Sequence, residues 1–134
     1  MARRREARRL AVQILYQADV ARRPPAEVLE ERREVGQRIP GFTEDLVRGV
    51  AERLPDLDRL IGGYAQGWTV RRMAAVDRAI LRVACYELLH RDDVPAAAAI
   101  DEAVTTAKEM STEESGGFVN GILGRVARDL APSG

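Results

Sequence analysis

The sequence has little of what disulfides, metal sites and aromatic cores are made from. Its 134 residues include one cysteine, one histidine and 4% aromatic residues. One cysteine excludes an intramolecular disulfide framework and a cysteine-based zinc site, and it is typical of the reducing cytoplasm. No apolar run approaches the roughly 20 residues of a membrane span, and Gln13 and Gln17 interrupt the segment where a signal peptide would be apolar. We therefore expect a cytoplasmic protein without a membrane partner.

Catalytic motifs are also missing. The acidic pairs lack the spacing of a calcium loop, and no glycine-rich phosphate loop, serine elbow or zinc motif occurs. His90 falls near an expected helix end, and Cys85 falls inside an apolar helix, where an inert buried thiol is the default. We expect no catalytic residue, no metal and no cofactor, and hence a protein that is not an enzyme.

The net charge is also zero, but only when it is summed over the whole chain. The 21 basic and 21 acidic residues cancel. Residues 1–23 nevertheless contain seven arginines against Glu6 and Asp19, whereas residues 92–114 contain seven acidic residues against Lys108. Such an asymmetry points to nucleic-acid or protein partners.

What the sequence does have is helical periodicity along its whole length. Apolar residues recur at the i, i+3, i+4, i+7 spacing of one helical face. The expected helices cover residues 7–18, 26–35, 43–54, 56–64, 73–89, 96–110 and 118–130. The segment 111–117 is polar and reads as a flexible connection. We predict an all-α fold of about seven helices in two small packed bundles, forming one domain over residues 1–134 with approximate sub-bundles 1–68 and 69–134.

The first helix is the strongest candidate for a binding surface. Its arginines cannot pair with one another, and Glu6 is the only acid near them in sequence. Uncompensated guanidinium groups favour an anionic partner, because their planar donors suit phosphate and stack on bases. Tyr16 adds a stacking platform of the kind used for single-stranded nucleic acid. The alternative is a solvated charged face without a ligand.

A second candidate surrounds the glycine pair Gly116-Gly117. Phe118 could stack on a base, although its pattern favours the core. Glu114 could accept hydrogen bonds from base amino groups or could only stabilise a helix N-terminus. Asn120 and Gly121 are poor helix formers inside an expected helix, which indicates a structural use such as close helix approach.

Several short blocks occur in an order that one known family shares. They are Arg4-Arg5-Glu6-Ala7-Arg8 with Ala11-Val12-Gln13-Ile14-Leu15-Tyr16, the run from Asp77 to Leu88, Asp93-Val94-Pro95, Ile100-Asp101-Glu102-Ala103-Val104, Ala107-Lys108 and Phe118-Val119-Asn120-Gly121-Ile122-Leu123. The chain thereby resembles the NusB family of bacterial transcription antitermination factors over most of its length. The resemblance implies a helical fold of two bundles that binds boxA-type single-stranded RNA of nascent ribosomal RNA. It also implies a complex with the small-subunit ribosomal protein NusE within the antitermination machinery.

The same resemblance implies roles for individual residues. The arginine-rich first helix contacts RNA in the family, and the loop before the Phe-Val-Asn-Gly block takes part. The candidate RNA-binding set is therefore Arg3, Arg4, Arg5, Arg8, Arg9, Tyr16, Glu114 and Phe118. Asp77 is expected near the RNA and partner surface, with Arg82 as its support. Asp101 and Gly117 depart from the family pattern, and Gly117 removes a basic residue that is common before the phenylalanine.

Two other functions fit the same residues. The arginine helix could instead dock on an acidic protein or on a second copy of the chain, with region 92–114 receiving the arginine face of a neighbour. The fold also occurs as the N-terminal domain of a ribosomal-RNA cytosine methyltransferase. Nothing in this chain resembles the cofactor-binding α/β domain of such an enzyme, which favours a stand-alone factor.

Overall fold

The computed structural model describes residues 2–130, which form seven α-helices and one short 3₁₀ helix. In chain order they are α1 (Ala2–Ala21), α2 (Pro25–Glu34), α3 (Gly41–Glu52), α4 (Leu54–Tyr64), η1 (Val70–Arg72), α5 (Ala75–His90), α6 (Ala96–Met110) and α7 (Glu113–Leu130). No strand occurs within residues 2–130. The expected all-α class with about seven helices is confirmed.

Prolines set where most of these helices begin. Pro24, Pro40 and Pro95 occupy the N-cap positions of α2, α3 and α6, and Pro25 and Pro55 lie in the first turns of α2 and α4. Proline has no backbone donor to lose at these positions, but it blocks extension of a helix from the preceding side. The prolines therefore separate helices that the apolar periodicity alone would leave joined.

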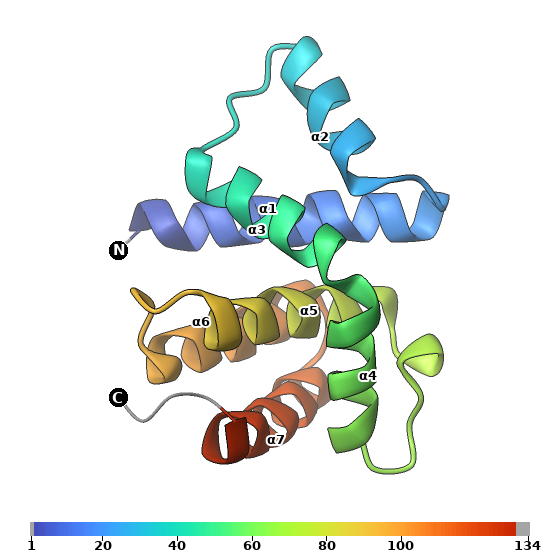
Figure 1. Cartoon of the computed structure of the whole chain (residues 1–134), viewed down its shortest axis with the longest axis vertical. Helices are drawn as coiled ribbons and strands as arrows, with labels where there is room; N and C mark the ends of the chain where they lie inside the picture. The colour runs from blue at the N-terminus through green and yellow to red at the C-terminus, as the bar shows by residue number, and fades with distance from the viewer. Residues whose placement is uncertain (1, 131–134) are drawn as a thin grey trace.

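The helices form two groups, which pack against each other where α1 contacts α5. α1, α2 and α3 make one group, and α5, α6 and α7 make the other (Figure 1). α4 packs against α5 and α7, so it joins the second group, whereas a division after residue 68 would place it with the first. One core runs through both groups and includes Ile14, Leu46, Leu81 and Leu123, all fully buried.

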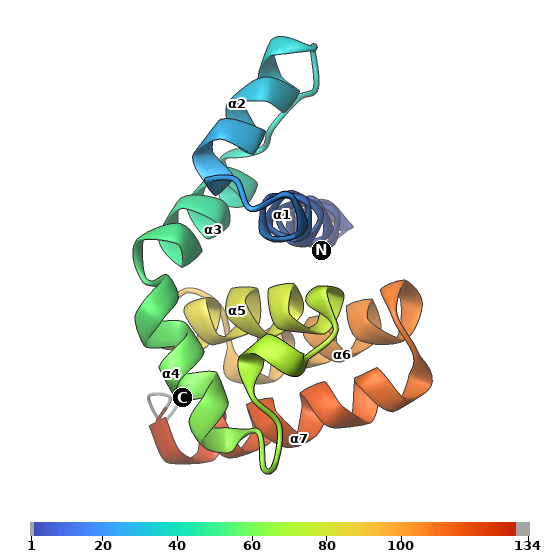
Figure 2. The ribbon, with the colours of Figure 1, turned by 90° about the vertical axis from the view of Figure 1, so that its right-hand side faces the viewer.

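α5 lies at the centre of this arrangement. α1 crosses above α5, and α7 runs on the other side of the layer that α5 and α6 form (Figure 2). Eleven of the 16 residues of α5 are buried, including Asp77, Arg82 and Glu87. Burial of charged side chains is costly unless each has a partner. The central helix therefore carries charges that must be paired by its neighbours.

α7 begins earlier than the sequence indicated. Thr112 accepts a hydrogen bond from the Ser115 backbone amide at 3.0 Å and so caps the helix, which then starts at Glu113. Gly116 is buried in the first turn, where an added Cβ would meet the side chain of Lys108 at 2.7 Å. The expectation of a flexible connection over 111–117 was therefore wrong, because a cap and close packing order this segment.

None of the helices within residues 2–130 is long and apolar enough to cross a membrane.

Candidate nucleic-acid interface

From the sequence alone, the arginines in the first half of α1 were expected to lack acidic partners. In the structure each of them except Arg3 pairs with an acidic residue on another helix or loop. The pairs are Arg4 with Asp93 at 2.8 Å, Arg5 with Glu102 at 3.0 Å, Arg8 with Glu87 at 2.8 Å, and Arg9 with Glu109. The prediction of uncompensated guanidiniums was wrong because the fold places α5, α6 and the loop between them beside α1. The acidic region 92–114 thus receives the arginine face of its own chain.

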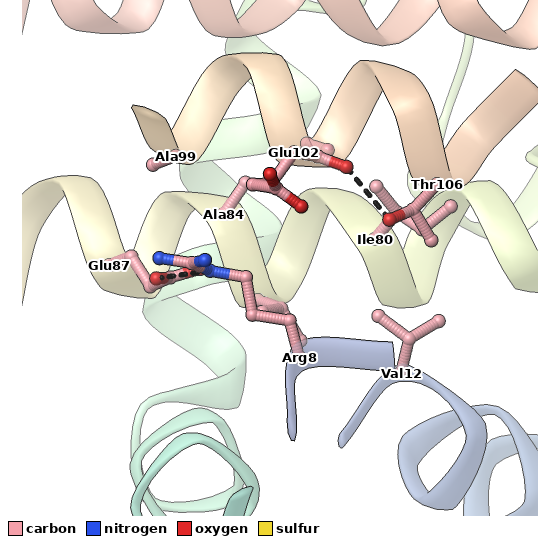
Figure 3. A pocket seen from close by; sticks show the side chains of 10 residues that line it. Arg8, Val12, Ile80, Ala84, Glu87, Ala99, Glu102 and Thr106 are labelled. Carbon is pink, nitrogen blue, oxygen red and sulfur yellow. Dashed lines mark hydrogen bonds and ion pairs between the residues drawn. The ribbon is translucent and has the colours of Figure 1, made fainter. Parts of the chain in front are cut away.

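The pair of Arg8 and Glu87 is the buried member of this set. Arg8 Nε donates to Glu87 Oε1 at 2.8 Å and to Oε2 at 3.1 Å, and Figure 3 shows Arg8 reaching from α1 toward α5. Burial raises the pKa of the Glu87 carboxyl, and the positive charge of Arg8 opposes that shift. The adjoining cavity, which Glu102 and Thr106 also line, has a volume of about 10 Å³, the space of one water. This part of α1 is therefore a packed contact with no room for a nucleotide.

The other three pairs lie nearer to solvent. Asp93 accepts from Arg4 Nη2 at 2.8 Å and from both Arg91 Nε and Nη2 at 2.9 Å. Hydrogen bonds from Arg91 and Arg4 lower the pKa of the Asp93 carboxyl, and a hydrogen bond from Arg5 lowers that of Glu102. Exposed pairs of this kind contribute little to stability, because water and salt screen them. These ion pairs can therefore be replaced by contacts to phosphate at little cost in free energy. Arg3 is also exposed near them on α1.

Phe42 joins this cluster, although nothing in the sequence analysis singled it out. The guanidinium carbons of Arg4, Arg91 and Arg8 lie 4.4, 4.8 and 5.2 Å from the centre of its ring. Such cation–π contacts stabilise cations that are held close together. No spacing pattern signals the contact, because Phe42 comes from α3 and its partners come from α1 and the segment after α5.

Tyr16 is the exposed aromatic residue of α1. The residue is 39% exposed and lines an open apolar hollow with Val20, Val76 and Met110. An exposed ring beside aliphatic side chains is suited to stacking on a base or to packing on a partner protein. The position predicted from the sequence is thus accessible.

Asp77 connects this hollow to the start of α7. It follows Val76 in sequence, is 7% exposed, and accepts a hydrogen bond from Ser115 Oγ at 3.0 Å. Its other oxygen, Oδ1, is buried without a hydrogen-bond partner within residues 2–130. Tyr16 and Val76 line one hollow, and Asp77, which follows Val76, is hydrogen-bonded to Ser115, the residue next to the exposed Glu114.

Arg82 does not support Asp77 as expected. Its Nε and Nη2 donate to Asp58 Oδ1 and Oδ2, both at 2.8 Å, and the residue is 8% exposed. The register explains the error, because a step of five positions along a helix, from 77 to 82, places the two side chains on different faces. Arg82 therefore organises the contact of α4 with α5.

On α7, the phenylalanine packs against the core, whereas the glycines at 117 and 121 are exposed. Phe118 is half-buried and packs against the core, as its pattern favoured. Asn120 and Gly121 are exposed, and a Cβ added to Gly117 or Gly121 would meet nothing within 4 Å. The expected structural use of Asn120 and Gly121 in close helix packing was therefore wrong, since this face of α7 is open.

A second set of arginines lies at the opposite end of α1 and was missed. Arg22 follows the helix, and Arg71 belongs to η1; both line a cleft with Arg78 and Arg82. Arg22 and Arg71 are visible in the sequence as basic residues beside prolines or turns, but no sequence pattern joins segments 49 residues apart. Within residues 2–130, no cluster of histidine, cysteine and acidic residues is arranged to hold a metal ion.

Comparisons with known proteins agree with this fold. The NusB family model matches residues 5–128. The transcription antitermination protein NusB of Salinispora arenicola (strain CNS-205) is 48% identical over 131 residues, which cover 95% of this chain and 96% of that protein. The structure of T. maritima NusB matches with a TM-score of 0.86 and 39% identity, over 96% of this chain and 93% of that one. A structure of antitermination factors NusB and NusE in complex with dsRNA shares the fold, with a TM-score of 0.84, 24% identity, and coverage of 96% of this chain and 98% of that one.

Proposed function

The chain belongs to the NusB family of transcription antitermination proteins, and from this premise we propose that it binds boxA-type single-stranded RNA of nascent ribosomal RNA together with NusE. In this proposal the protein is a cytoplasmic, non-enzymatic adaptor. It joins an RNA element to a ribosomal protein inside the antitermination complex.

One observation carries the RNA-binding proposal. Tyr16 is exposed on the same helix as Arg4, Arg5 and Arg9, whose ion pairs lie at or near the surface. A stacking ring with exchangeable guanidiniums on one helix is the combination that single-stranded nucleic acid requires. Arg8 has a different role, because its buried pair with Glu87 fixes the helix that presents the others.

Binding at the N-terminal half of α1 proceeds by exchange of partners. A phosphate that approaches Arg4 or Arg5 takes the place of the Asp93 or Glu102 carboxylate. Guanidinium donors match phosphate as well as carboxylate, so the hydrogen bonds that are lost are made again. The exposed Glu114 and the half-buried Phe118, on the part of α7 where Ser115 bonds to Asp77, would then contact bases or NusE.

A solved structure with the same fold supports NusE as the partner. In that structure, NusB and NusE are together in complex with dsRNA. The apolar hollow beside Tyr16 gives this chain a surface on which a protein or a base could pack. A homodimer through the arginine face is less favoured, because it would have to replace pairs that the chain already makes with itself.

Gel-shift titration of a boxA-type single-stranded RNA, with and without NusE, tests the proposal. We expect the pair of proteins to bind the RNA more tightly than either protein alone. A single-stranded RNA of the same composition in scrambled order and a duplex of the same length serve as controls. Equal affinity for the boxA-type and scrambled strands, or no effect of NusE, would contradict the proposal.

A further inference from the structure

The cleft at the C-terminal end of α1 has more positive charge than its own acidic residues neutralise. This basic cleft is an open hollow of about 740 Å³ between α1, α4, η1 and α5. Its charged lining residues are Asp19, Arg22, Asp58, Arg71, Arg78 and Arg82. Four arginines face two aspartates, so the lining has an excess of two positive charges.

Both aspartates are already engaged by the two inner arginines. Asp58 accepts from Nε and Nη2 of Arg82 at 2.8 Å, and Asp19 accepts from Nε of Arg78 at 2.8 Å. Arg78 Nη1 also donates to the backbone carbonyls of Val70 and of the following residue, which fixes η1 against α5. The floor of the basic cleft is therefore held together by ion pairs, and each of its two carboxylates already has an arginine partner.

Donors that remain unused line the same hollow. Arg82 Nη1 lies 3.6 Å from Asp19, beyond hydrogen-bond distance. Arg22 and Arg71 are exposed and form no ion pair with an acidic residue among residues 2–130. This contrasts with the N-terminal half of α1, where Arg4, Arg5, Arg8 and Arg9 all have acidic partners.

The backbone at Arg22 gives an independent reason to look for a ligand there. Arg22 ends α1 in the left-handed region, with φ of 55°. Its amide bonds to the Asp19 carbonyl at 3.2 Å, and the Arg23 amide bonds to the Ala18 carbonyl at 2.9 Å, which is the Schellman pattern that usually has glycine at this position. A side chain costs stability in this conformation, and such strain is characteristic of functional positions.

We propose that the basic cleft binds backbone phosphates of the RNA that the chain recognises, an inference that rests on the proposed function above. Guanidinium groups bind phosphate through paired hydrogen bonds, and four of them line one hollow. Val20 lines both the basic cleft and the apolar hollow of Tyr16. A strand with a base on Tyr16 therefore has its next phosphates beside the cleft, at the end of α1 opposite to the arginine-rich start.

Charge substitutions at the two outer arginines test this site. The probe is a fluorescently labelled boxA-type single-stranded RNA, titrated by anisotropy at several salt concentrations. We expect Arg71→Glu to weaken binding by about tenfold. Each lost contact should also reduce the log–log salt slope by about 0.7. Arg38→Glu is the matched control, because Arg38 is exposed and lies outside the cleft in the segment between α2 and α3; it should change neither quantity.

Arg22→Gly separates binding from folding. Glycine removes the charge and also relieves the left-handed conformation, so this variant should unfold at the same or a higher denaturant concentration while it binds RNA more weakly. The combined Arg22→Gly and Arg71→Glu variant should lose about 1.4 from the salt slope, if each arginine neutralises one phosphate.

Three results would overturn the inference, and they differ in what else they affect. If the combined variant keeps its fold, measured by circular dichroism, and binds RNA with unchanged affinity and slope, the cleft is not a phosphate site but the proposed function stands. If the variant keeps its RNA affinity and loses only NusE, the cleft is a protein contact. If the unchanged chain binds no RNA at any salt concentration, both the inference and the proposed function fail.

Discussion

Arg8 on α1 and Glu87 on α5 form a buried ion pair that joins the two groups of helices. Their side chains are 11% and 1% exposed, and Arg8 Nε lies within 3.1 Å of both carboxylate oxygens. A buried charge without its partner is strongly unfavourable, whereas replacement of both charges by apolar residues is often neutral.

Removal of one member of this pair should therefore destabilise the protein far more than removal of both. We expect Glu87→Leu to lower the free energy of unfolding by about 3 kcal/mol, and Arg8→Leu with Glu87→Leu to recover most of that loss. Urea unfolding of the two single variants and the double variant measures the coupling. Losses that simply add would show that the two charges do not depend on each other.

Neutralising an acidic partner of α1 should increase RNA affinity. Glu102→Gln frees Arg5, whose Nε and Nη2 donate to that carboxylate at 3.0 Å. Because an ion pair near the surface is weak, we expect an affinity gain of up to about fivefold for boxA-type RNA. Glu34→Gln on α2 is the control with the same change of charge at an exposed position. Weaker binding by Glu102→Gln would mean instead that Glu102 orients Arg5 for the RNA.

The same acidic partners should make the fold sensitive to acid. Hydrogen bonds from arginines lower the pKa of Asp93 and Glu102 in the folded chain. The unfolded chain, with ordinary values of about 3.9 and 4.3, therefore binds protons first as the pH falls. Stability from these groups is complete above that range and is lost as pH falls toward the lowered folded values. Urea midpoints between pH 7 and pH 3 should fall less for Glu102→Gln than for the unchanged chain, and equal slopes would contradict the assignment.

The contact of α3 with α5 depends on a glycine. A Cβ added at Gly49 would collide with the ring of Tyr86, a residue that is itself buried. We expect Gly49→Ala to destabilise the fold by about 2 kcal/mol, because overpacking forces side chains or helices apart. Gly63→Ala on α4 is the control, since nothing lies within 4 Å of its added Cβ. That exposed helical site should gain about 0.5–1 kcal/mol from alanine.

Cys85 should be inert in the folded protein. The thiol is fully buried in α5, and burial raises its pKa to about 12. Alkylation needs the thiolate and access to it, so iodoacetamide at pH 8 should modify the chain only when denaturant unfolds it. Mass spectrometry of native and urea-treated samples makes the comparison. Rapid labelling without denaturant would show that α5 opens locally.

The sequence was sufficient for the helices and their core, because apolar spacing and prolines are local signals. It also predicted that the ring of Tyr16 is accessible, and the family resemblance added Asp77, Glu114 and Phe118 as candidate site residues. The ion pairs could not be predicted from the sequence. Both poles of charge were visible, but pairing Arg5 with Glu102 requires knowing that α6 lies beside α1. The cleft of Arg22 and Arg71 was missed for the same reason, since four separate segments meet there only after folding.

The ion pairs that the first helix makes within its own chain also affect how fast the protein binds and releases RNA. Opposite charges held a few ångströms apart produce a field that fades over a short distance, and salt screens what is left. Long-range attraction, which accelerates the capture of any polyanion, is therefore weak at that end of the molecule. Encounters with unrelated RNA should be brief, and selection among transcripts should appear in how slowly the right one dissociates.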